Sequence, residues 1–311
     1  MGTMWTAEQI PDEGGRTAIV TGANSGLGLI EARELARHGA QVLIASRDLA
    51  KAEAAAAAIR LTVRSASLEV AQLDLANLNS VRTFSQRFLA GHRRLDLLIN
   101  NAGVMAAPYQ RTMDGFELQF GTNHLGHFAL TGLLLPALRD QPGARVVTVS
   151  SNAHKRGQMR FDDLQGERRY SRWGAYAQSK LANLLFAFEL DRRLKAASLP
   201  LISVAAHPGY SATNLQLSAP PLHERLVMRL SNRFIAQTAE MGSLPILYAA
   251  TAPGLEGGSY VGPDGRGEQR GYPTLVQATD RARDAADARR LWEISEQLTG
   301  VTYDLPSLLR A

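Results

Sequence analysis

The chain has 311 residues, of which 45% are hydrophobic and 20% are charged, and its 34 basic and 29 acidic residues leave a formal net charge of +5. This balance is ordinary for a soluble globular protein, and the basic residues are too scattered to predict a nucleic-acid-binding surface. The sequence contains no cysteine, which excludes disulfides, thiol catalysis and thiolate metal sites.

No segment has the composition of an export signal or a membrane span. The N-terminal stretch MGTMWTAEQIPDEGG lacks the basic-then-apolar order of a signal peptide. The longest apolar stretch, residues 128–138, contains Thr131 and Gly132 and is too short to cross a bilayer. No linker rich in Ser, Gly or Pro divides the chain. We therefore expect one cytoplasmic domain over residues 1–311, without a membrane span or nucleic-acid partner, and leave homo-oligomer formation open.

Short apolar runs alternate along the chain with helical segments. The runs are continuously apolar, which is typical of strands buried under helices on both faces. Repeated strand–helix units predict right-handed crossovers and a parallel sheet. The expected strands are residues 17–21, 41–45, 68–75, 95–100, 145–150 and 201–207, and the expected helices are residues 27–38, 51–60, 81–89, 116–138, 176–194 and 281–298. The predicted fold is α/β, a single-domain, Rossmann-type, doubly wound parallel sheet, whose ligands bind beyond the carboxyl ends of the strands.

The first expected strand leads through the glycine-rich turn TGANSGLG, residues 21–28, into the first helix. Gly22, Gly26 and Gly28 allow the backbone to turn sharply and to approach a pyrophosphate, which the helix N-terminus stabilises. The other residues of this turn that we expect at the cofactor are Asn24, Ser25 and Leu27. An ordinary turn could have this composition, but its place in the first strand–helix unit favours a dinucleotide site.

The second expected strand is followed by Ser46, Arg47 and Asp48. Sheets that bind NAD carry an acidic residue here, which accepts a hydrogen bond from the ribose 2′-hydroxyl. Arg47 would instead form charge-assisted bonds to the 2′-phosphate, so the sequence favours NADP(H) over NAD(H). Two points argue against this preference. Asp48 is acidic, although one position further on, and Ser46 with Arg47 is also a sensible helix cap beside a solvated side chain.

The third and fourth expected strands also end in residues suited to a ligand. Asp74, followed by Leu75, is placed either to accept from an adenine amino group or to cap the next helix. The fourth strand ends in NNAG, in which Asn101, Ala102 and Gly103 are compact enough for close backbone approach. By itself NNAG is also a plain turn sequence.

Together these motifs resemble the short-chain dehydrogenases/reductases. TGANSGLG, LDL, NNAG, Asn123 in GTNHLGHF, Ser150–Ser151, Tyr176-x-x-x-Lys180 and HPGYSAT occur in the order found in that family, from about residue 16 to residue 262. More narrowly, NNAGVM, DGFELQFGTNHLGHF, FDDLQGERRY and AYAQSKLANLLF are similar to the retinol dehydrogenase and WW-domain oxidoreductase branch. The ordered set is specific, whereas no single motif is.

The resemblance implies hydride exchange between a nicotinamide and a carbonyl or alcohol carbon. Tyr176 would be the general acid in carbonyl reduction and the base in alcohol oxidation. Lys180, one helical turn later, would lower the pKa of the tyrosine and hold the nicotinamide ribose. Ser151, rather than a structural Ser150, would bond the substrate oxygen, and Asn123 would hold a water in a proton relay through Lys180.

Three further features follow from the resemblance. Pro208, Gly209 and Thr213 match the segment that contacts the nicotinamide in the family. Residues 211–241 correspond to the substrate lid, and their apolar side chains favour a lipophilic substrate, although packing against the body or another subunit would explain them equally well. Residues 278–311 are expected to form a C-terminal helix and tail.

The remaining polar candidates fit structural roles. His124 and His127 share a helical spacing, but no carboxylate or third histidine completes a metal pattern, so we expect no metal. Asp162 and Asp163 are expected to be solvated or to cap a helix, and His207 to be structural.

We therefore expect an NADP(H)-dependent oxidoreductase that interconverts a carbonyl and an alcohol on a small-molecule substrate. Two other functions remain open. One is an NADP-sensing binding module without useful turnover, which the intact Asn123, Ser151, Tyr176 and Lys180 argue against. The other is an enzyme that reduces a carbon–carbon double bond, as relatives similar to protochlorophyllide reductase do.

Overall fold

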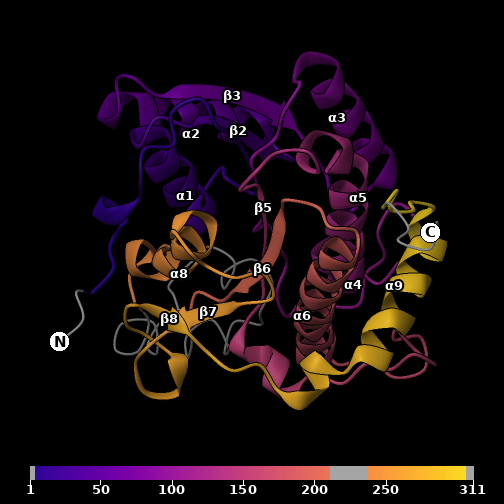
Figure 1. Cartoon of the computed structure of the whole chain (residues 1–311). Helices are drawn as coiled ribbons and strands as arrows, with labels where there is room; N and C mark the ends of the chain where they lie inside the picture. Colours follow the sequence, from indigo (N-terminus) through magenta and orange to yellow (C-terminus); the bar gives the residue numbers. More distant parts are fainter. Residues whose placement is uncertain (1–3, 211–236, 306–311) are drawn as a thin grey trace.

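The computed structural model of the protein describes residues 4–210 and 237–305, which form an eight-stranded sheet between two layers of helices (Figure 1). The strand order is β3-β2-β1-β4-β5-β6-β7-β8. The strands are β1 Thr17–Thr21, β2 Gln41–Ser46, β3 Ser67–Gln72, β4 Leu97–Asn100, β5 Arg145–Val149, β6 Ile202–Ala206, β7 Tyr260–Pro263 and β8 Pro273–Leu275. All neighbouring pairs are parallel except β7 and β8, which are antiparallel. The predicted doubly wound sheet is confirmed, with one antiparallel edge strand.

The two helical layers explain why the strand sequences are continuously apolar. The helices are α1 Gly26–Arg37, α2 Leu49–Thr62, α3 Leu78–Gly91, α4 Leu118–Phe120, α5 Gly126–Leu138, α6 Arg172–Ala196, α8 Ala239–Thr251 and α9 Ala285–Thr299. Helices α1, α2 and α8 cover one face of the sheet, and α3, α5, α6 and α9 lie on the other (Figure 1). Val20 of β1 packs under the first layer and Ile19 under the second. Each inner strand therefore buries both of its faces.

The expected helix over residues 116–138 is interrupted in the structure. Helix α4 is followed by a π-helical turn, Gly121–Leu125, before α5 begins. A π-turn inserts one extra residue and rotates the side chains that follow it. At Gly126 an added Cβ would lie 2.4 Å from the carbonyl oxygen of Leu75, so glycine lets this helix pass directly over the connection after β3. The interruption carries Asn123 and sets where it lies.

Among the strands and α-helices of the described residues, the sequence did not predict α8, β7 or β8. The two strands are only four and three residues long, and they contain proline and glycine, which are depleted in strands. Pairing of β7 with β6 at Ala205 and Ala206, rather than local preference, makes them strands. The third expected strand also ends earlier than residue 75, at Gln72.

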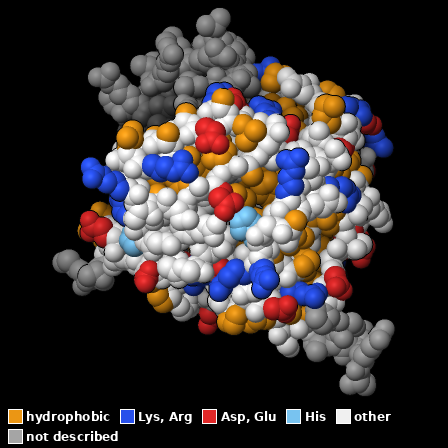
Figure 2. Space-filling model, turned by 90° about the horizontal axis from the view of Figure 1, so that it is seen from above, with side chains coloured by type: hydrophobic (Ala, Val, Ile, Leu, Met, Phe, Trp, Pro, Cys, Tyr) orange, Lys and Arg blue, Asp and Glu red, His pale blue; other side chains and the backbone are white. Residues whose placement is uncertain are grey.

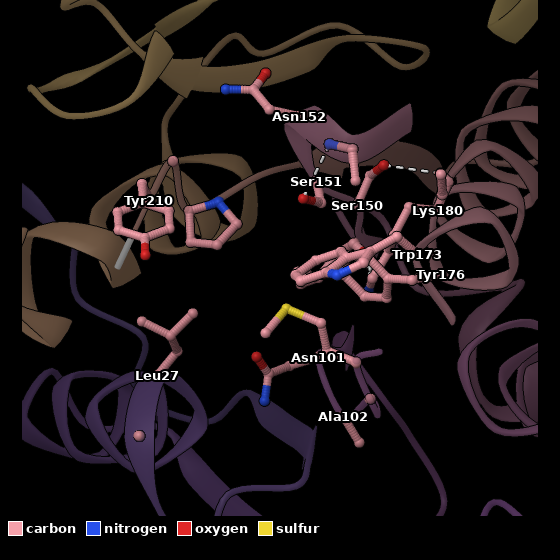
Figure 3. A pocket seen from close by; sticks show the side chains of 18 of the residues that line it. Leu27, Asn101, Ala102, Ser150, Ser151, Asn152, Trp173, Tyr176, Lys180 and Tyr210 are labelled. Carbon is pink, nitrogen blue, oxygen red and sulfur yellow. Dashed lines mark hydrogen bonds between the residues drawn. The ribbon is translucent and has the colours of Figure 1, made fainter. Parts of the chain in front are cut away.

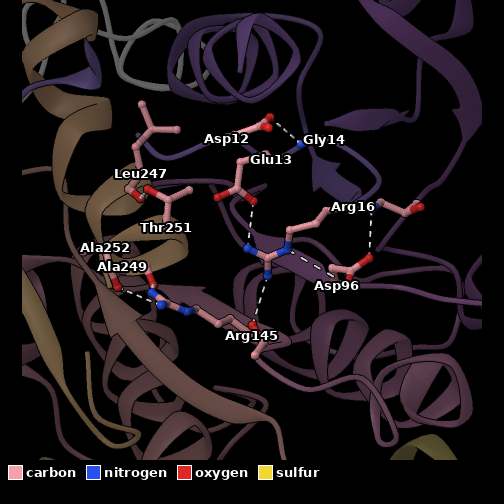
Figure 4. A network of polar contacts seen from close by, with 12 residues as sticks. Asp12, Glu13, Gly14, Arg16, Asp96, Arg145, Leu247, Ala249, Thr251 and Ala252 are labelled. Atoms are coloured by element: carbon pink, nitrogen blue, oxygen red, sulfur yellow. Dashed lines mark hydrogen bonds and ion pairs between the residues drawn. The ribbon is translucent and has the colours of Figure 1, made fainter. Parts of the chain in front are cut away.

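A buried polar network joins β1, β4 and β5 at their amino ends (Figure 4). Arg16 Nη1 donates to Glu13 Oε2 at 2.8 Å, and Asp96 Oδ2 accepts the backbone N–H of Thr17 at 2.9 Å. Arg145 donates to two carbonyl oxygens at the end of α8, at 3.0 and 2.7 Å. These bonds fasten the end of the sheet that lies opposite the expected ligand site.

The loop between β7 and β8 is fastened to the sheet by Glu268. Its carboxylate lies 3.0 Å from His207 Nε2 and accepts from Lys155 Nζ at 2.9 Å. His207 Nδ1 accepts the backbone N–H of Gly209 at 3.2 Å, so Nε2 carries the proton and donates to Glu268. The bond from His207 is the largest effect that lowers the pKa of Glu268, to about 2. Glu268 has a φ of 55°, a left-handed conformation that a non-glycine residue keeps only when its contacts impose it.

The face of the protein shown in Figure 2 is mixed in charge. On the face shown in Figure 2, Lys and Arg side chains lie among Asp and Glu rather than in one patch. Within residues 4–210 and 237–305, no helix is both long enough and apolar enough to cross a membrane. The same residues contain no group of three His, Asp or Glu side chains close enough to hold a metal ion.

Glu31 of α1 is a buried carboxyl group. It is 0% exposed, and neither of its oxygens has a hydrogen-bond partner among the residues that the structure describes. Burial raises its pKa from 4.5 to about 8. The folded protein therefore keeps this carboxyl mostly protonated at neutral pH, whereas the unfolded chain ionises it.

We predict that Glu31→Gln removes a pH-dependent loss of stability. Because the folded pKa is raised, the contribution of Glu31 is fully present below about pH 4.5 and is lost as the pH rises through about 8. Across this window the free energy of unfolding of the wild type should fall relative to the variant by about 1.4 kcal/mol per pH unit. Urea denaturation at several pH values measures the difference. The exposed Glu53→Gln is the control, and a pH-independent difference for Glu31→Gln would contradict the prediction.

We predict that Glu268→Ala destabilises the fold by about 1–3 kcal/mol, because it leaves the buried His207 N–H without an acceptor. Glu268→Gln should cost less, since its amide oxygen can still accept from His207. Urea denaturation of both variants tests this, with the exposed Glu256→Gln as the matched control. If Glu268→Ala and Glu268→Gln lower the free energy of unfolding equally, or by no more than the control does, the contacts of Glu268 with His207 and Lys155 do not stabilise the loop.

Candidate active site

A cavity of about 980 Å³ opens at the carboxyl ends of β1, β4, β5 and β6 (Figure 3). It brings together five segments that the sequence analysis selected separately. The selected residues that line it are Gly22, Asn24, Ser25, Gly26, Leu27, Asn101, Ala102, Gly103, Ser151, Tyr176, Lys180, Pro208 and Gly209. In Figure 3, Leu27 and Tyr210 lie on one side of the cavity, and Trp173 and Tyr176 on the other.

The glycine-rich turn and the NNAG turn form one wall. Gly22 has a φ of +70°, and an added Cβ would lie 3.0 Å from the Cβ of Ala102, so only glycine fits this contact. The Thr21 hydroxyl accepts the backbone N–H groups of Asn101 and Ala102 at 2.9 and 3.0 Å, and Asn101 Nδ2 donates to the Thr21 carbonyl at 2.8 Å. Ser25, at the N-cap of α1, makes no side-chain cap within the described structure. The uncapped N–H groups and the missing side-chain bulk fit a dinucleotide pyrophosphate.

Tyr176, Lys180 and Ser151 meet on the opposite wall. Tyr176 and Lys180 are 6% and 3% exposed, and Lys180 Nζ lies 5.8 Å from the centre of the Tyr176 ring. Lys180 Nζ donates to the carbonyl oxygen of Val149 at 3.0 Å. Ser151 Oγ accepts the backbone N–H of Ala153 at 3.2 Å, and its hydroxyl acts on the Tyr176 phenol by lowering the pKa of that group. A hydroxyl, a phenol and an ammonium group are thus held together at one end of the cavity.

Burial has the largest effect on the pKa values of Tyr176 and Lys180. It raises the pKa of Tyr176 to about 12, against the bond from Ser151, which lowers it. Burial also lowers the pKa of Lys180 to about 8. The expected net lowering of the tyrosine pKa is therefore not found in the protein alone, because burial outweighs the bond from Ser151. Tyr176 is protonated at neutral pH, as a proton donor must be.

A second layer of hydrogen bonds holds helix α6 against β5. Ser150 Oγ donates to the carbonyl oxygen of Lys180 at 2.8 Å, which agrees with its expected structural role. Asn183 Nδ2 donates at 3.0 Å to the same β5 carbonyl that accepts from Lys180. Ser179 Oγ donates to the carbonyl oxygen of Tyr176 at 2.8 Å. The positions of the phenol and the ammonium group are therefore set by backbone contacts.

Asn123 lies behind this wall rather than in the cavity lining. Its side-chain amide accepts from and donates to the backbone of Val104, at 2.8 and 2.9 Å, and makes a third bond to α6 at 3.0 Å. The backbone carbonyl oxygen of Asn123 lies 3.0 Å from His127 Nδ1. An added Cβ on Gly103 would lie 3.1 Å from Asn123 Oδ1 and 3.7 Å from Lys180 Nζ. The Asn123 side chain therefore uses its hydrogen bonds to hold the NNAG turn in place.

The structure does not bring all of the expected cofactor residues to the cavity. Gly28, Arg47, Asp74 and Leu75 are outside its lining, and Thr213 lies outside the described residues. An added Cβ on Gly28 would lie 2.6 Å from Asn101 Nδ2, so this glycine serves close packing behind the turn. The expected lid, residues 211–241, is described only from residue 237, and its last residues belong to α8.

The acidic residues after β2 and β3 are engaged locally. Asp48 is the N-cap of α2, where it accepts the backbone N–H of Lys51 at 3.1 Å and pairs with the same lysine at 3.0 Å. Asp74 accepts the backbone N–H of Ala76 at 3.0 Å, and Asn77, not Asp74, caps α3. Arg47 is exposed and has no ion pair among the described residues.

The other polar candidates have structural contacts. His124 Nε2 lies 2.9 Å from Ser295 Oγ, and burial lowers the pKa of His124 to about 3. Burial likewise lowers the pKa of His127 to about 4. Asp163 accepts three backbone N–H groups, from residues 167, 168 and 169. Asp162 pairs with Arg168 at the surface.

Several lining residues were not selected from the sequence. They are Met105, Val149, Ser150, Asn152, Ala153, Lys155, Arg156, Trp173, Gly174, Ala177, Tyr210, Gly267 and Gln269. Trp173 was accessible to sequence reasoning, because it precedes Tyr176 by three residues and so shares its helix face. No sequence pattern predicted Gly267 or Gln269 at the cavity. They reach it through a loop whose path depends on the contacts of Glu268 with His207 and Lys155.

Comparisons with known proteins identify the family of this chain. The short chain dehydrogenase family model matches residues 16–221. Mouse retinol dehydrogenase 12 is 43% identical over 305 residues, covering 97% of this chain and 91% of the relative, and mouse polyprenol dehydrogenase is 43% identical over 301 residues, covering 94% and 86%.

The chain is also similar to proteins of known structure. The crystal structure of an uncharacterised protein from Mycobacterium paratuberculosis is 50% identical, with a TM-score of 0.82, and the match covers 97% of this chain and 100% of that one. The RhlG/NADP active-site complex of Pseudomonas aeruginosa is 25% identical, with a TM-score of 0.61 and coverage of 79% and 94%. The chain therefore belongs to the short-chain dehydrogenase family of oxidoreductases, in its retinol dehydrogenase-like branch.

Proposed function

We propose that the protein is an NADP(H)-dependent oxidoreductase that interconverts an aldehyde or ketone with an alcohol. The observation that carries the proposal is the meeting of Ser151, Tyr176 and Lys180 in one cavity with a glycine cradle suited to a dinucleotide. The names of the relatives, retinol dehydrogenase and polyprenol dehydrogenase, also point to alcohol substrates.

The cofactor would be held along the carboxyl edge of the sheet. The residues proposed to hold it are Gly22, Asn24, Ser25, Gly26, Leu27, Gly28, Arg47, Asp74, Leu75, Asn101, Ala102, Gly103, Tyr176, Lys180, Pro208, Gly209 and Thr213. When bound, the nicotinamide supplies or accepts the hydride. Gly28, Asp74 and Leu75 would act by shaping the turns behind the lining, since they do not form part of it.

The chain's own residues would move the proton. In reduction, the Tyr176 phenol donates its proton to the carbonyl oxygen as hydride reaches the carbon, and the same residue removes the proton in oxidation. The Ser151 hydroxyl donates a hydrogen bond to the oxygen as negative charge develops there. The Lys180 ammonium stabilises the tyrosinate that remains. Asn123 would hold a water in a proton relay that runs through Lys180.

The preference for NADP(H) rests on Arg47. Its side chain is exposed at the end of β2, where a 2′-phosphate would lie in a dinucleotide site. Asp48, the acidic residue that argued for NAD, is engaged in capping α2. A lipophilic substrate is supported by Met105, Trp173 and Tyr210 in the lining. From the family resemblance we also propose residues 211–241 as the substrate lid.

We predict that Tyr176→Phe lowers turnover by about 10²- to 10⁴-fold, because the proton donor is lost. Binding of NADPH should stay within about twofold of the wild-type value, because the ring that packs in the site is kept. Turnover of a panel of aldehydes and ketones, together with NADPH fluorescence titration, measures both effects. Tyr109→Phe is the control. Substantial remaining turnover would remove Tyr176 from its role.

We predict that Arg47→Asp shifts the ratio of kcat/KM for NADPH to that for NADH toward NADH by about 10-fold or more, because charge-assisted bonds are replaced by repulsion. Arg64→Asp, an exposed arginine at the other end of the sheet, is the control. An unchanged ratio would discard the Arg47 assignment. Failure of the wild type to bind NADPH at millimolar concentration would defeat the proposed function itself.

Two alternative functions are separated by the same assays. NADPH binding without turnover of any aldehyde or ketone would indicate a binding module. Analysis of the product from an unsaturated carbonyl compound would reveal reduction of the carbon–carbon double bond instead.

A further inference from the structure

The charges that line the catalytic cavity are all positive. Lys155, Arg156 and Lys180 line it, whereas no Asp or Glu does so in the part of the chain that the structure describes. Lys180 is buried and bonded to a carbonyl oxygen at 3.0 Å. Lys155 is neutralised by Glu268, whose carboxylate accepts from it at 2.9 Å. The side chain of Arg156 is exposed and has no hydrogen bond or ion pair with any described residue.

The nearby carboxylates do not neutralise Arg156. Arg156 also lines a smaller cavity of about 90 Å³, together with Glu117 and Asp163. Glu117 accepts two backbone N–H groups of α4, at 2.9 and 2.7 Å. Asp163 accepts three backbone N–H groups of its own turn, at 2.8, 3.3 and 3.2 Å. Neither carboxylate forms an ion pair with Arg156, so the guanidinium remains available to a ligand.

Arg156 is held within reach of the reacting groups. It ends the 3₁₀ segment Asn152–Arg156, which begins directly after Ser151. At about 2 Å of rise per residue, this segment places the two backbones roughly 10 Å apart. The next residue, Gly157, packs on α6 so tightly that an added Cβ would lie 2.6 Å from the carbonyl oxygen of Ala177, the neighbour of Tyr176. The backbone of Arg156 is therefore fixed relative to the catalytic helix.

We propose that Arg156 binds an anionic group at the far end of the substrate, so that the enzyme selects amphipathic aldehydes, ketones or alcohols that carry a carboxylate. The inference rests on the proposed function of this same cavity. The carbonyl end would lie at Ser151 and Tyr176, the apolar body against Trp173, and the carboxylate at the guanidinium. Arginine suits this task because its planar fork matches the geometry of a carboxylate.

The test compares ω-oxo carboxylic acids of six, eight and ten carbons with their methyl esters, using wild type and Arg156→Met with saturating NADPH. We expect the wild type to prefer the acid of at least one length by about 10-fold or more in kcat/KM, with the difference in KM rather than kcat, because the bond is remote from the reacting carbon. Arg156→Met should lose this preference and keep its activity on the esters. The control is Arg168→Met, whose arginine lines neither cavity.

Equal use of acid and ester by the wild type, or a preference that survives Arg156→Met, would overturn the proposal. If the wild type reduces neither compound, the proposed reaction fails on these substrates, and binding still tests Arg156. Octanoate should then bind the NADPH-loaded protein more tightly than octanamide, by thermal shift or calorimetry, and Arg156→Met should abolish the difference. Equal binding of the two compounds by the wild type would overturn the assignment of Arg156 independently of turnover.

Discussion

The Thr21 hydroxyl is the contact on which the geometry of the site depends. It accepts the N–H groups of Asn101 and Ala102 and lies 3.0 Å from His127 Nε2. Because His127 is neutral and uses its Nδ1–H toward the carbonyl of Asn123, its Nε2 accepts the hydroxyl proton. One buried hydroxyl thereby joins the glycine-rich turn, the NNAG turn and helix α5, whose His127 in turn contacts Asn123 of the π-helical turn. A shift in any of these elements would leave buried polar groups unpaired.

The same desolvation that makes these contacts strong also decides the resting charge of the site. Burial raises the pKa of Tyr176 to about 12 and lowers that of Lys180 to about 8. Both shifts favour the neutral form, as burial in a low dielectric requires. The protein alone therefore presents a protonated phenol, which is the form needed to reduce a carbonyl, beside an ammonium group that loses its charge in mildly alkaline solution.

The charges around the cavity depend on which groups pair with each other. Glu268 forms an ion pair with Lys155 and fixes the loop after β7. Glu117 and Asp163 instead accept hydrogen bonds from backbone N–H groups. Arg156, at the wall of the same cavity, has no ion pair or hydrogen bond with any residue that the structure describes.

The sequence by itself determined the doubly wound sheet, because continuously apolar strands and helical spacing are local signals, and it selected the glycine turn, Ser151, Tyr176 and Lys180 through their ordered motifs. It did not determine β7 and β8, which exist by pairing with β6, or the π-turn that withdraws Asn123 from the cavity. Only the tertiary structure decided that Asp48 caps a helix, that Glu268 pairs with Lys155 and that Arg156 has no partner among the described residues. Such outcomes depend on which distant groups compete for each charge, and this competition has no local signature in a sequence.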